Sequence, residues 1–289
     1  MQPSVLPATG DPLQSETMDE QLPDSVTVKG AAVRYGTTGS GPDILLVHGN
    51  AANHWWWRDY VAALEPHWRV TTMEFSGHGE SDRRDAYSPT LWAEELDAVA
   101  AATGAKSLVV VGHSMGARTA LSWAGERQPA ALRGLVIFDM GLRPPGEFRE
   151  SSPTRDPMRV YETREQAIAR FRLYPPQPAP AGDIIEYIAS HSVRHDPDGW
   201  RFKHDTGILG LFDDVASDAA ARRVIAPITF AYGARSALAN AHYAEHLRAV
   251  VPAPTEIIRF EDVHHHLVLE DPERCIQVIE VAARKYFGL

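Results

Sequence analysis

The sequence predicts an α/β fold, with a mostly parallel central sheet, helices on both faces and an inserted helical lid. Short apolar runs alternate with helical stretches as far as residue 140, and the alternation resumes at residue 224. The apolar runs are continuous, which is typical of strands buried on both faces of a parallel sheet. Between the two alternating parts, residues 141–223 carry many prolines and charges and only short helical pieces. This interruption indicates an insertion and not another sheet unit.

The elements of the sheet domain follow from these patterns in chain order. Residues 25–41 are typical of a hairpin. Further along the chain, Gly104 is a plausible C-terminal end for the helix expected at 89–105. Further strands are expected at 42–50, 69–82 (running into a glycine-rich loop), 107–114, 132–140, 228–233 and 255–262. Helices are expected at 54–68, 89–105, 115–128, 240–251 and from 272 to the end.

Three segments therefore make up the predicted chain. Residues 1–24 are rich in Pro, Asp, Glu, Gln and Ser, so we expect a disordered leader. Residues 25–140 and 224–289 form the α/β core. Residues 141–223, which include RPPGE and YPPQPAPAG, form the helical lid inserted after the sixth strand.

Composition excludes several classes of function. The chain has 289 residues, 44% of them hydrophobic and 23% charged, which are ordinary values for a globular protein. Its formal net charge is −10 and it has no Lys/Arg-rich run, so nucleic acid is not expected as a partner. The one cysteine, Cys275, allows neither an intrachain disulfide nor a thiolate metal cluster.

The sequence pattern shows neither an export signal nor a membrane span. The N-terminus has no basic start followed by an apolar stretch, so no signal peptide is expected. No stretch reaches the roughly 20 apolar residues that a membrane span needs. We therefore expect a cytoplasmic protein without membrane contact; its oligomeric state does not follow from the sequence.

The strongest local motif is G-x-S-x-G at Gly112–Gly116, which lies between a buried strand and a helix. The turn is so tight that larger flanking side chains would collide. It lifts the hydroxyl of Ser114 clear of the sheet and places it at a helix N-terminus. Ser114 is therefore the predicted nucleophile.

With this motif the chain resembles the alpha/beta hydrolases, from about Val26 to Leu289. LLVHGN is similar to the family's oxyanion loop, and MEFSGHGESD is similar to a family loop from which it departs at Glu74 and Ser76. The resemblance implies the alpha/beta-hydrolase fold. These motifs are specific for the fold and much less specific for the substrate.

A tetrahedral intermediate needs two hydrogen-bond donors aimed at its developing negative charge. We expect these donors to be the backbone N–H groups of Asn50 and Met115, which follow the His-Gly pair and the nucleophile. His48 is expected to brace the loop and not to take part in the chemistry.

The general base must be a histidine, and His264, His265 and His266 follow the last predicted strand. The family pattern, counted back from Glu270-Asp271-Pro272, selects His265. The family's glycine is replaced by His264. Three consecutive histidines point in different directions, so a tetrahedral metal site is not expected here.

The position of the acid departs from the commonest family pattern. Most members have Gly-x-x-Asp after strand seven, but this chain has Gly233-Ala234-Arg235-Ser236, and no Asp or Glu lies between Val224 and Tyr243. Either catalysis is impaired and the protein is a binder, or the acid lies elsewhere. Asp139, at the end of strand six, is the predicted acid. The resemblance is then to a branch that includes small bacterial esterases and cofactor-free quinolone dioxygenases.

Four further residues are candidates for the substrate pocket. Trp55 and Trp56 lie just beyond the oxyanion loop, and Trp200 lies in the lid; simple packing is the alternative for all three. Arg118 follows the nucleophile by one helical turn, and an exposed or ion-paired helix arginine is the alternative there.

The predicted function is hydrolysis of a carboxylic ester, thioester or lactone through a Ser114–His265–Asp139 triad and an acyl-enzyme. No cofactor or metal is implied, and the expected partner is a small acyl substrate. Two alternatives remain open: a cofactor-independent dioxygenase or C–C bond hydrolase on the same fold, and a non-catalytic binding or signalling protein.

Overall fold

The structure is a computed structural model that describes residues 22–148 and 158–289. The predicted leader, residues 1–24, lies outside this range except for its last three residues. Leu22 is buried, and the first strand begins at Asp24.

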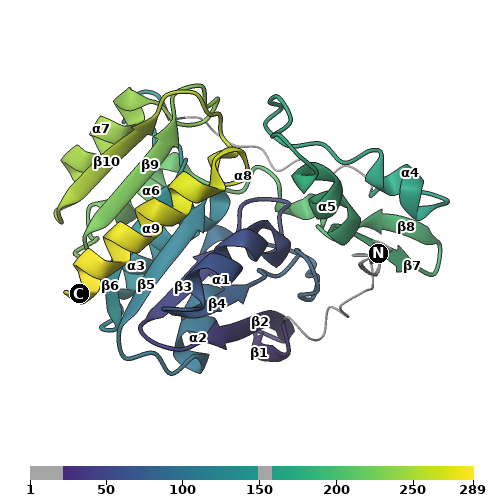
Figure 1. Cartoon of the computed structure of the whole chain (residues 1–289), viewed down its shortest axis with the longest axis horizontal. Coiled ribbons are helices and arrows are strands. Elements are labelled where there is room, and N and C mark those ends of the chain that lie inside the picture. Colours follow the sequence, from purple (N-terminus) through teal and green to yellow (C-terminus); the bar gives the residue numbers. More distant parts are fainter. Residues whose placement is uncertain (1–21, 149–157) are drawn as a thin grey trace, which may run out of the picture.

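Within the described residues, eight strands form one sheet in the order β1-β2-β4-β3-β5-β6-β9-β10 (Figure 1). Near one edge, β2 pairs antiparallel with both of its neighbours, β1 and β4. The other pairs are parallel, so the mostly parallel sheet is confirmed. The strands are β1 (Asp24–Val28), β2 (Ala31–Gly39), β3 (Asp43–Val47), β4 (Arg69–Met73), β5 (Leu108–His113), β6 (Leu132–Phe138), β9 (Ile228–Gly233) and β10 (Thr255–Phe260).

Helices cover both faces of this sheet (Figure 1). One face carries α1 (Arg58–Leu64) and α9 (Pro272–Phe287), preceded by the short elements η2 (His54–Trp57) and α8 (Leu267–Glu270). The other face carries α2 (Pro89–Ala102), α3 (Met115–Arg127) and α7 (Ala241–Val250).

The central strands explain why both faces must be covered. In β5, Leu108 and Val110 belong to the apolar core under α2 and α3, whereas Val109 and Val111 belong to the core under α1 and α9. All four side chains are buried, because successive residues of a strand point to opposite faces. The continuous apolar run in the sequence follows directly from this double burial.

The inserted segment contains more than helices. It holds α4 (Arg164–Ile168), α5 (Ile184–His191), η3 (Thr206–Ile208) and α6 (Asp214–Ala221), together with an antiparallel pair, β7 (Val193–Asp196) and β8 (Gly199–Phe202). Figure 1 shows α4, α5 and the β7–β8 pair beside the main sheet. In contrast, α6 packs against α3, where a Cβ on Gly125 would collide with the backbone of Ala220.

The parallel strands determine where the functional residues gather. The strands β3, β5, β6, β9 and β10 all run in the same direction, so their carboxyl ends lie along one edge of the sheet. The segments that follow these ends carry the predicted oxyanion donor, nucleophile, acid, Ser236 and base. Ligand sites of open α/β sheets lie at this edge.

None of the helices in the two described ranges combines the length and the apolar character that a membrane span requires.

Candidate active site

The turn that carries Ser114 has the geometry that its sequence predicts. Ser114 has φ 53° and ψ −114°, and it sits between the end of β5 and the first residue of α3. A Cβ on Gly112 would lie 2.6 Å from the Ala117 backbone nitrogen, and one on Gly116 would lie 2.4 Å from the His48 carbonyl oxygen. Both flanking positions therefore exclude any residue other than glycine.

The hydroxyl of Ser114 lies at one end of a chain of hydrogen bonds. Its Oγ is 3.0 Å from Nε2 of His265, and Nδ1 of His265 is 2.8 Å from Oδ1 of Asp139. An ionised carboxylate only accepts hydrogen bonds, so the Nδ1–H donates to Asp139 and Nε2 is left to accept the serine proton. The structure thus brings together the three residues that the sequence nominates.

Three hydrogen-bond donors fix the carboxylate of Asp139, the residue that follows β6. Its Oδ2 accepts from the Gly233 N–H at 2.9 Å, and its Oδ1 accepts from the Ser236 hydroxyl at 2.6 Å as well as from His265. The side chain is completely buried. A buried carboxylate with this many hydrogen-bond donors is held in one orientation.

Ser236 occupies the position at which the family pattern places the acid, and its side chain contacts Asp139. Its Oγ accepts hydrogen bonds from the N–H groups of Leu238 and Ala239, at 3.0 and 3.1 Å. With its oxygen engaged by two donors, its single proton is directed to Asp139. Sequence reasoning treated Ser236 only as a gap and missed this contact.

The neighbouring histidines have separate roles. His264 donates from both its backbone N–H and its Nδ1–H to the carboxylate of Glu270, each at 2.9 Å. His266 packs edge-on against Trp56. Of the three consecutive histidines, His265 is the one that reaches Ser114, and Glu270, from which the family pattern is counted, holds His264.

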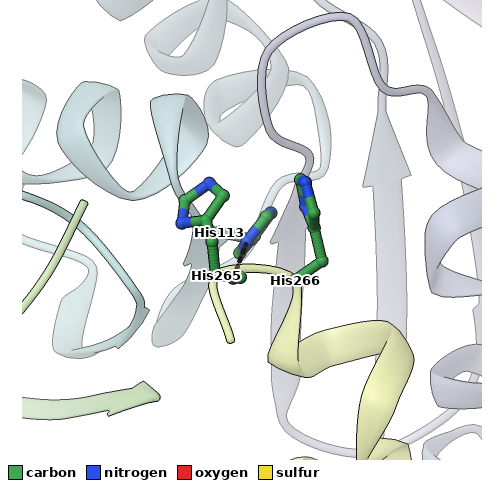
Figure 2. Close-up of side chains that lie close together, drawn as sticks. All are labelled: His113, His265 and His266. Carbon is green, nitrogen blue, oxygen red and sulfur yellow. Dashed lines mark hydrogen bonds between the residues drawn. The ribbon is translucent and has the colours of Figure 1, made fainter. Parts of the chain in front are cut away.

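His113 joins this group from the end of β5. Figure 2 shows its ring between those of His265 and His266, with its Nε2–H donating to the His265 carbonyl oxygen at 3.0 Å. Burial lowers the pKa of His113 well below the ordinary value, and burial lowers that of His266 to about 3. Both imidazoles are therefore neutral at neutral pH.

One nitrogen from each of His113, His265 and His266 lies within 4.8 Å of the others, and among the described residues this is the group that could hold a metal ion. Both nitrogens of His265 already serve the contacts to Asp139 and Ser114. A metal here would therefore compete with the triad. His264, although it belongs to the run of three consecutive histidines, is not part of this group. His113, from the end of β5, takes part instead.

The residues predicted to supply the oxyanion donors lie next to Ser114. Asn50 and Met115 line the same pocket as Ser114. Met115 is the first residue of α3, and the first N–H groups of a helix have no partner within the helix. His48 braces the loop of Asn50, since its Nδ1–H donates to the Gly49 carbonyl at 2.7 Å and its Nε2 accepts from the Phe75 N–H at 3.2 Å.

Glu74, one of the departures from the family pattern, ties two loops together. Its carboxylate accepts from the His54 side chain at 2.7 Å and from the Glu80 N–H at 2.7 Å. Burial alone would raise the pKa of Glu74, but His54 and the Glu80 N–H outweigh it and lower this pKa to about 2. A Cβ on Gly79 would lie about 2 Å from the same carboxylate, so the loop closes tightly around it.

A pocket of about 160 Å³ opens at Ser114. Arg118 lines it, which agrees with its place one helical turn after the nucleophile, and Arg118 is also ion-paired with Asp214. The pocket is lined by Asn50, Ser114, Met115, Arg118, Asp139, Met140, Gly141, Arg143, Phe212 and Leu238.

The three predicted tryptophans lie outside this lining. Trp56 is buried behind the triad, stacked on His113 at 6.1 Å between ring centroids. Trp55 packs against Tyr187 and His191 of α5 and lines a different cavity. Trp200, on β8, packs against His195 and pairs through its backbone with Tyr161. Packing therefore accounts for the positions of all three tryptophans. Arg143, which the sequence analysis did not single out, lines the pocket.

Comparison with known proteins identifies the family. The sequence profile of the alpha/beta hydrolase fold matches residues 42–186, half of the chain. The protein belongs to the alpha/beta hydrolase fold family. An uncharacterized protein of Mycobacterium tuberculosis is 25% identical over 88% of this chain and 79% of its own length.

Solved structures share the fold at lower sequence identity. The thioesterase domain from the curacin biosynthetic pathway superposes with a TM-score of 0.75 at 19% identity, covering 89% of this chain and 98% of that one. E-2-(acetamidomethylene)succinate hydrolase gives a TM-score of 0.73 at 20% identity, covering 92% and 98%. These similarities confirm the expected fold class.

Proposed function

We propose that this protein is a serine-dependent hydrolase that cleaves a carboxylic ester, thioester or lactone through an acyl-enzyme. The observation that carries the proposal is the unbroken set of hydrogen bonds from Ser114 through His265 to Asp139, at 3.0 and 2.8 Å. The names of two structural neighbours, a thioesterase domain and a succinate-derivative hydrolase, are consistent with this chemistry.

Each group has a defined part in the reaction. Ser114 Oγ attacks the carbonyl carbon as its proton passes to Nε2 of His265, and the carbonyl oxygen becomes an oxyanion held by the N–H groups of Asn50 and Met115. His265 then protonates the leaving alcohol or thiol as its bond to the acyl carbon breaks. Water, deprotonated by His265, attacks the acyl-enzyme and releases the acid and free Ser114.

The proposal is favoured over a non-catalytic binding protein by the surroundings of Asp139. A binder on this fold was suggested by the missing carboxylate at Ser236. In the structure, the Ser236 hydroxyl donates a hydrogen bond to Asp139 at 2.6 Å, so the residue at this position helps to hold the proposed acid. This contact supports a rearranged catalytic site over a degraded one.

Labelling with a fluorophosphonate probe tests the proposal. We expect the folded protein to be labelled at Ser114 and to hydrolyse p-nitrophenyl esters, and we expect Ser114→Ala to lose both properties. Ser122→Ala, at a buried serine about two turns further along the same helix, is the matched control and should keep both. A folded protein whose Ser114 does not react would be a ligand-binding member of the fold.

A further inference from the structure

The pocket at Ser114 has an unusual concentration of positive charge. Arg118 lies four residues after Ser114 on α3, so both side chains leave the same face of the helix. Arg143 enters the pocket from the segment that follows β6. Two guanidinium groups therefore share a small cavity with the nucleophile.

One carboxylate lies between the two guanidinium groups. Asp214, at the start of α6, accepts from Arg118 through one oxygen and from Arg143 through the other, the latter at 3.1 Å. Arg118 also donates to the Gly141 carbonyl oxygen at 2.9 Å. Asp139 also lines the pocket, but its carboxylate is engaged by Gly233, Ser236 and His265. The two guanidinium groups thus share the Asp214 carboxylate, and the carboxylate of Asp213, which caps α6, also acts electrostatically on Arg118.

Both arginines retain donors that the protein does not use. In each of them the Nε–H is buried and has no hydrogen-bond acceptor among the described residues. A buried donor without a partner destabilises the protein, and an acceptor on a bound ligand would relieve that cost. Burial also lowers the pKa of Arg118, which reflects how poorly this cation is solvated.

The rest of the lining determines what kind of anion fits. Met140, Phe212 and Leu238 give the cavity an apolar wall, which strengthens a charge interaction inside it. The cavity volume of about 160 Å³ is small beside the roughly 300–1,000 Å³ of pockets for drug-sized ligands. A planar carboxylate on a short chain matches both the size and the guanidinium geometry.

We propose that this pocket is a carboxylate subsite, and that the substrate is a short ester or thioester bearing a second, free carboxylate a few atoms from the scissile carbonyl. The inference rests on the proposed serine hydrolase function and names its substrate class. The second carboxylate would accept hydrogen bonds from Arg118 and Arg143 while the scissile carbonyl faces Ser114.

Matched substrate pairs test this directly. Monoethyl glutarate is compared with ethyl 4-carbamoylbutanoate, in which a neutral amide replaces the carboxylate; 4-acetoxybutanoate is compared with 4-acetoxybutanamide. The first pair places the carboxylate on the acyl side and the second on the alcohol side. Acid release is followed in a pH-stat. In one of the two pairs, kcat/KM should be about tenfold to hundredfold higher for the charged member, because a hydrogen bond to a charged group contributes a preference of this size. A ratio near one in both pairs would overturn the proposal.

The variant Arg143→Gln links any preference to the pocket, because it removes one guanidinium and keeps a polar side chain. We expect the charged-to-neutral ratio of kcat/KM to fall at least several-fold in it. Arg248→Gln changes the same charge on the exposed surface of α7 and should keep the wild-type ratio. An unchanged ratio in folded Arg143→Gln would contradict the assignment.

Inhibition of the wild-type protein provides a measurement that needs no variant. Glutarate should compete with a neutral p-nitrophenyl ester, and the uncharged glutaramide should not. If Ser114 is labelled and neutral esters are cleaved but neither charge preference nor glutarate inhibition is found, only the carboxylate subsite fails. If Ser114 is unreactive and no ester is cleaved, the proposed function itself fails.

Discussion

Asp139 combines an uncommon backbone conformation with a fully satisfied carboxylate. Its φ of 47° lies in the left-handed region, which aspartate tolerates better than most residues. Its backbone N–H donates to the Ala231 carbonyl oxygen at 2.8 Å, which continues the pairing of β6 with β9. The same turn that takes the chain out of β6 therefore holds the carboxylate against His265.

The sequence indicates that an acid is missing at Ser236 and that Asp139 is the nearest alternative. The role of Ser236 itself is not readable from the sequence. Its hydroxyl meets Asp139 because β6 and β9 are neighbours in the register that pairs Phe138 with Ala231. Such a contact depends on the pairing of strands far apart in the chain.

Ser236→Ala should lower kcat/KM about tenfold, which corresponds to the loss of roughly 1.4 kcal/mol of transition-state stabilisation. Without this donor the Asp139 carboxylate is held less firmly against His265. Ser236→Thr keeps a hydroxyl and should retain most of the activity. Wild-type kcat/KM in folded Ser236→Ala would show that the contact is irrelevant to catalysis.

At the level of elements, the sequence predicts the core best where a local signal agrees with burial. The helix expected from residue 272 begins at Pro272, and the Asp271 side chain caps it by accepting from the Arg274 N–H at 3.2 Å. The helix expected from residue 89 begins there too, with Ser88 as its cap. In both cases a capping residue and a proline at the first turn fix the start.

Two elements differ from the prediction for physical reasons. The helix expected at 54–68 divides into η2 and α1 and ends at Leu64. The Asn53 side chain caps the start of η2 by accepting from the Trp55 N–H at 3.2 Å. The β7–β8 pair and the packing of α6 on α3 arise from contacts within and beneath the insertion. Segments this short carry too little periodicity to be read from sequence.

At the scale of the whole molecule, several neutral histidines are buried around the site. Burial lowers the pKa of His48 to about 4 and that of His266 to about 3, and burial lowers the pKa of His78 and His113 well below the ordinary value of about 6.5. The unfolded chain takes up protons at these residues below about pH 6.5, whereas the folded protein does not. The free energy of unfolding is therefore greatest above this pH and falls as pH drops toward 4.

Urea unfolding followed by tryptophan fluorescence at pH 7.5, 6 and 5 checks this expectation. Each histidine contributes a slope of at most about 1.4 kcal/mol per pH unit. Glu74, whose pKa is lowered to about 2, loses its contribution only below about pH 4.5 and does not enter this window. His266→Gln should make the slope shallower, and His67→Gln, at an exposed position, should not. A stability that is flat between pH 7.5 and 5 would contradict the assignment of neutral buried histidines.

The whole account depends on the acid that follows β6, and the turnover of Asp139→Asn tests it most directly. The amide keeps the size of the side chain but cannot hold the Nδ1–H tautomer of His265, and such a change lowers kcat by about 10⁴-fold in a serine protease. Asp262→Asn, at a highly exposed carboxylate paired with Arg235, is the control and should remain active. We expect folded Asp139→Asn to lose at least about a thousandfold in kcat. A wild-type rate in that variant would contradict it.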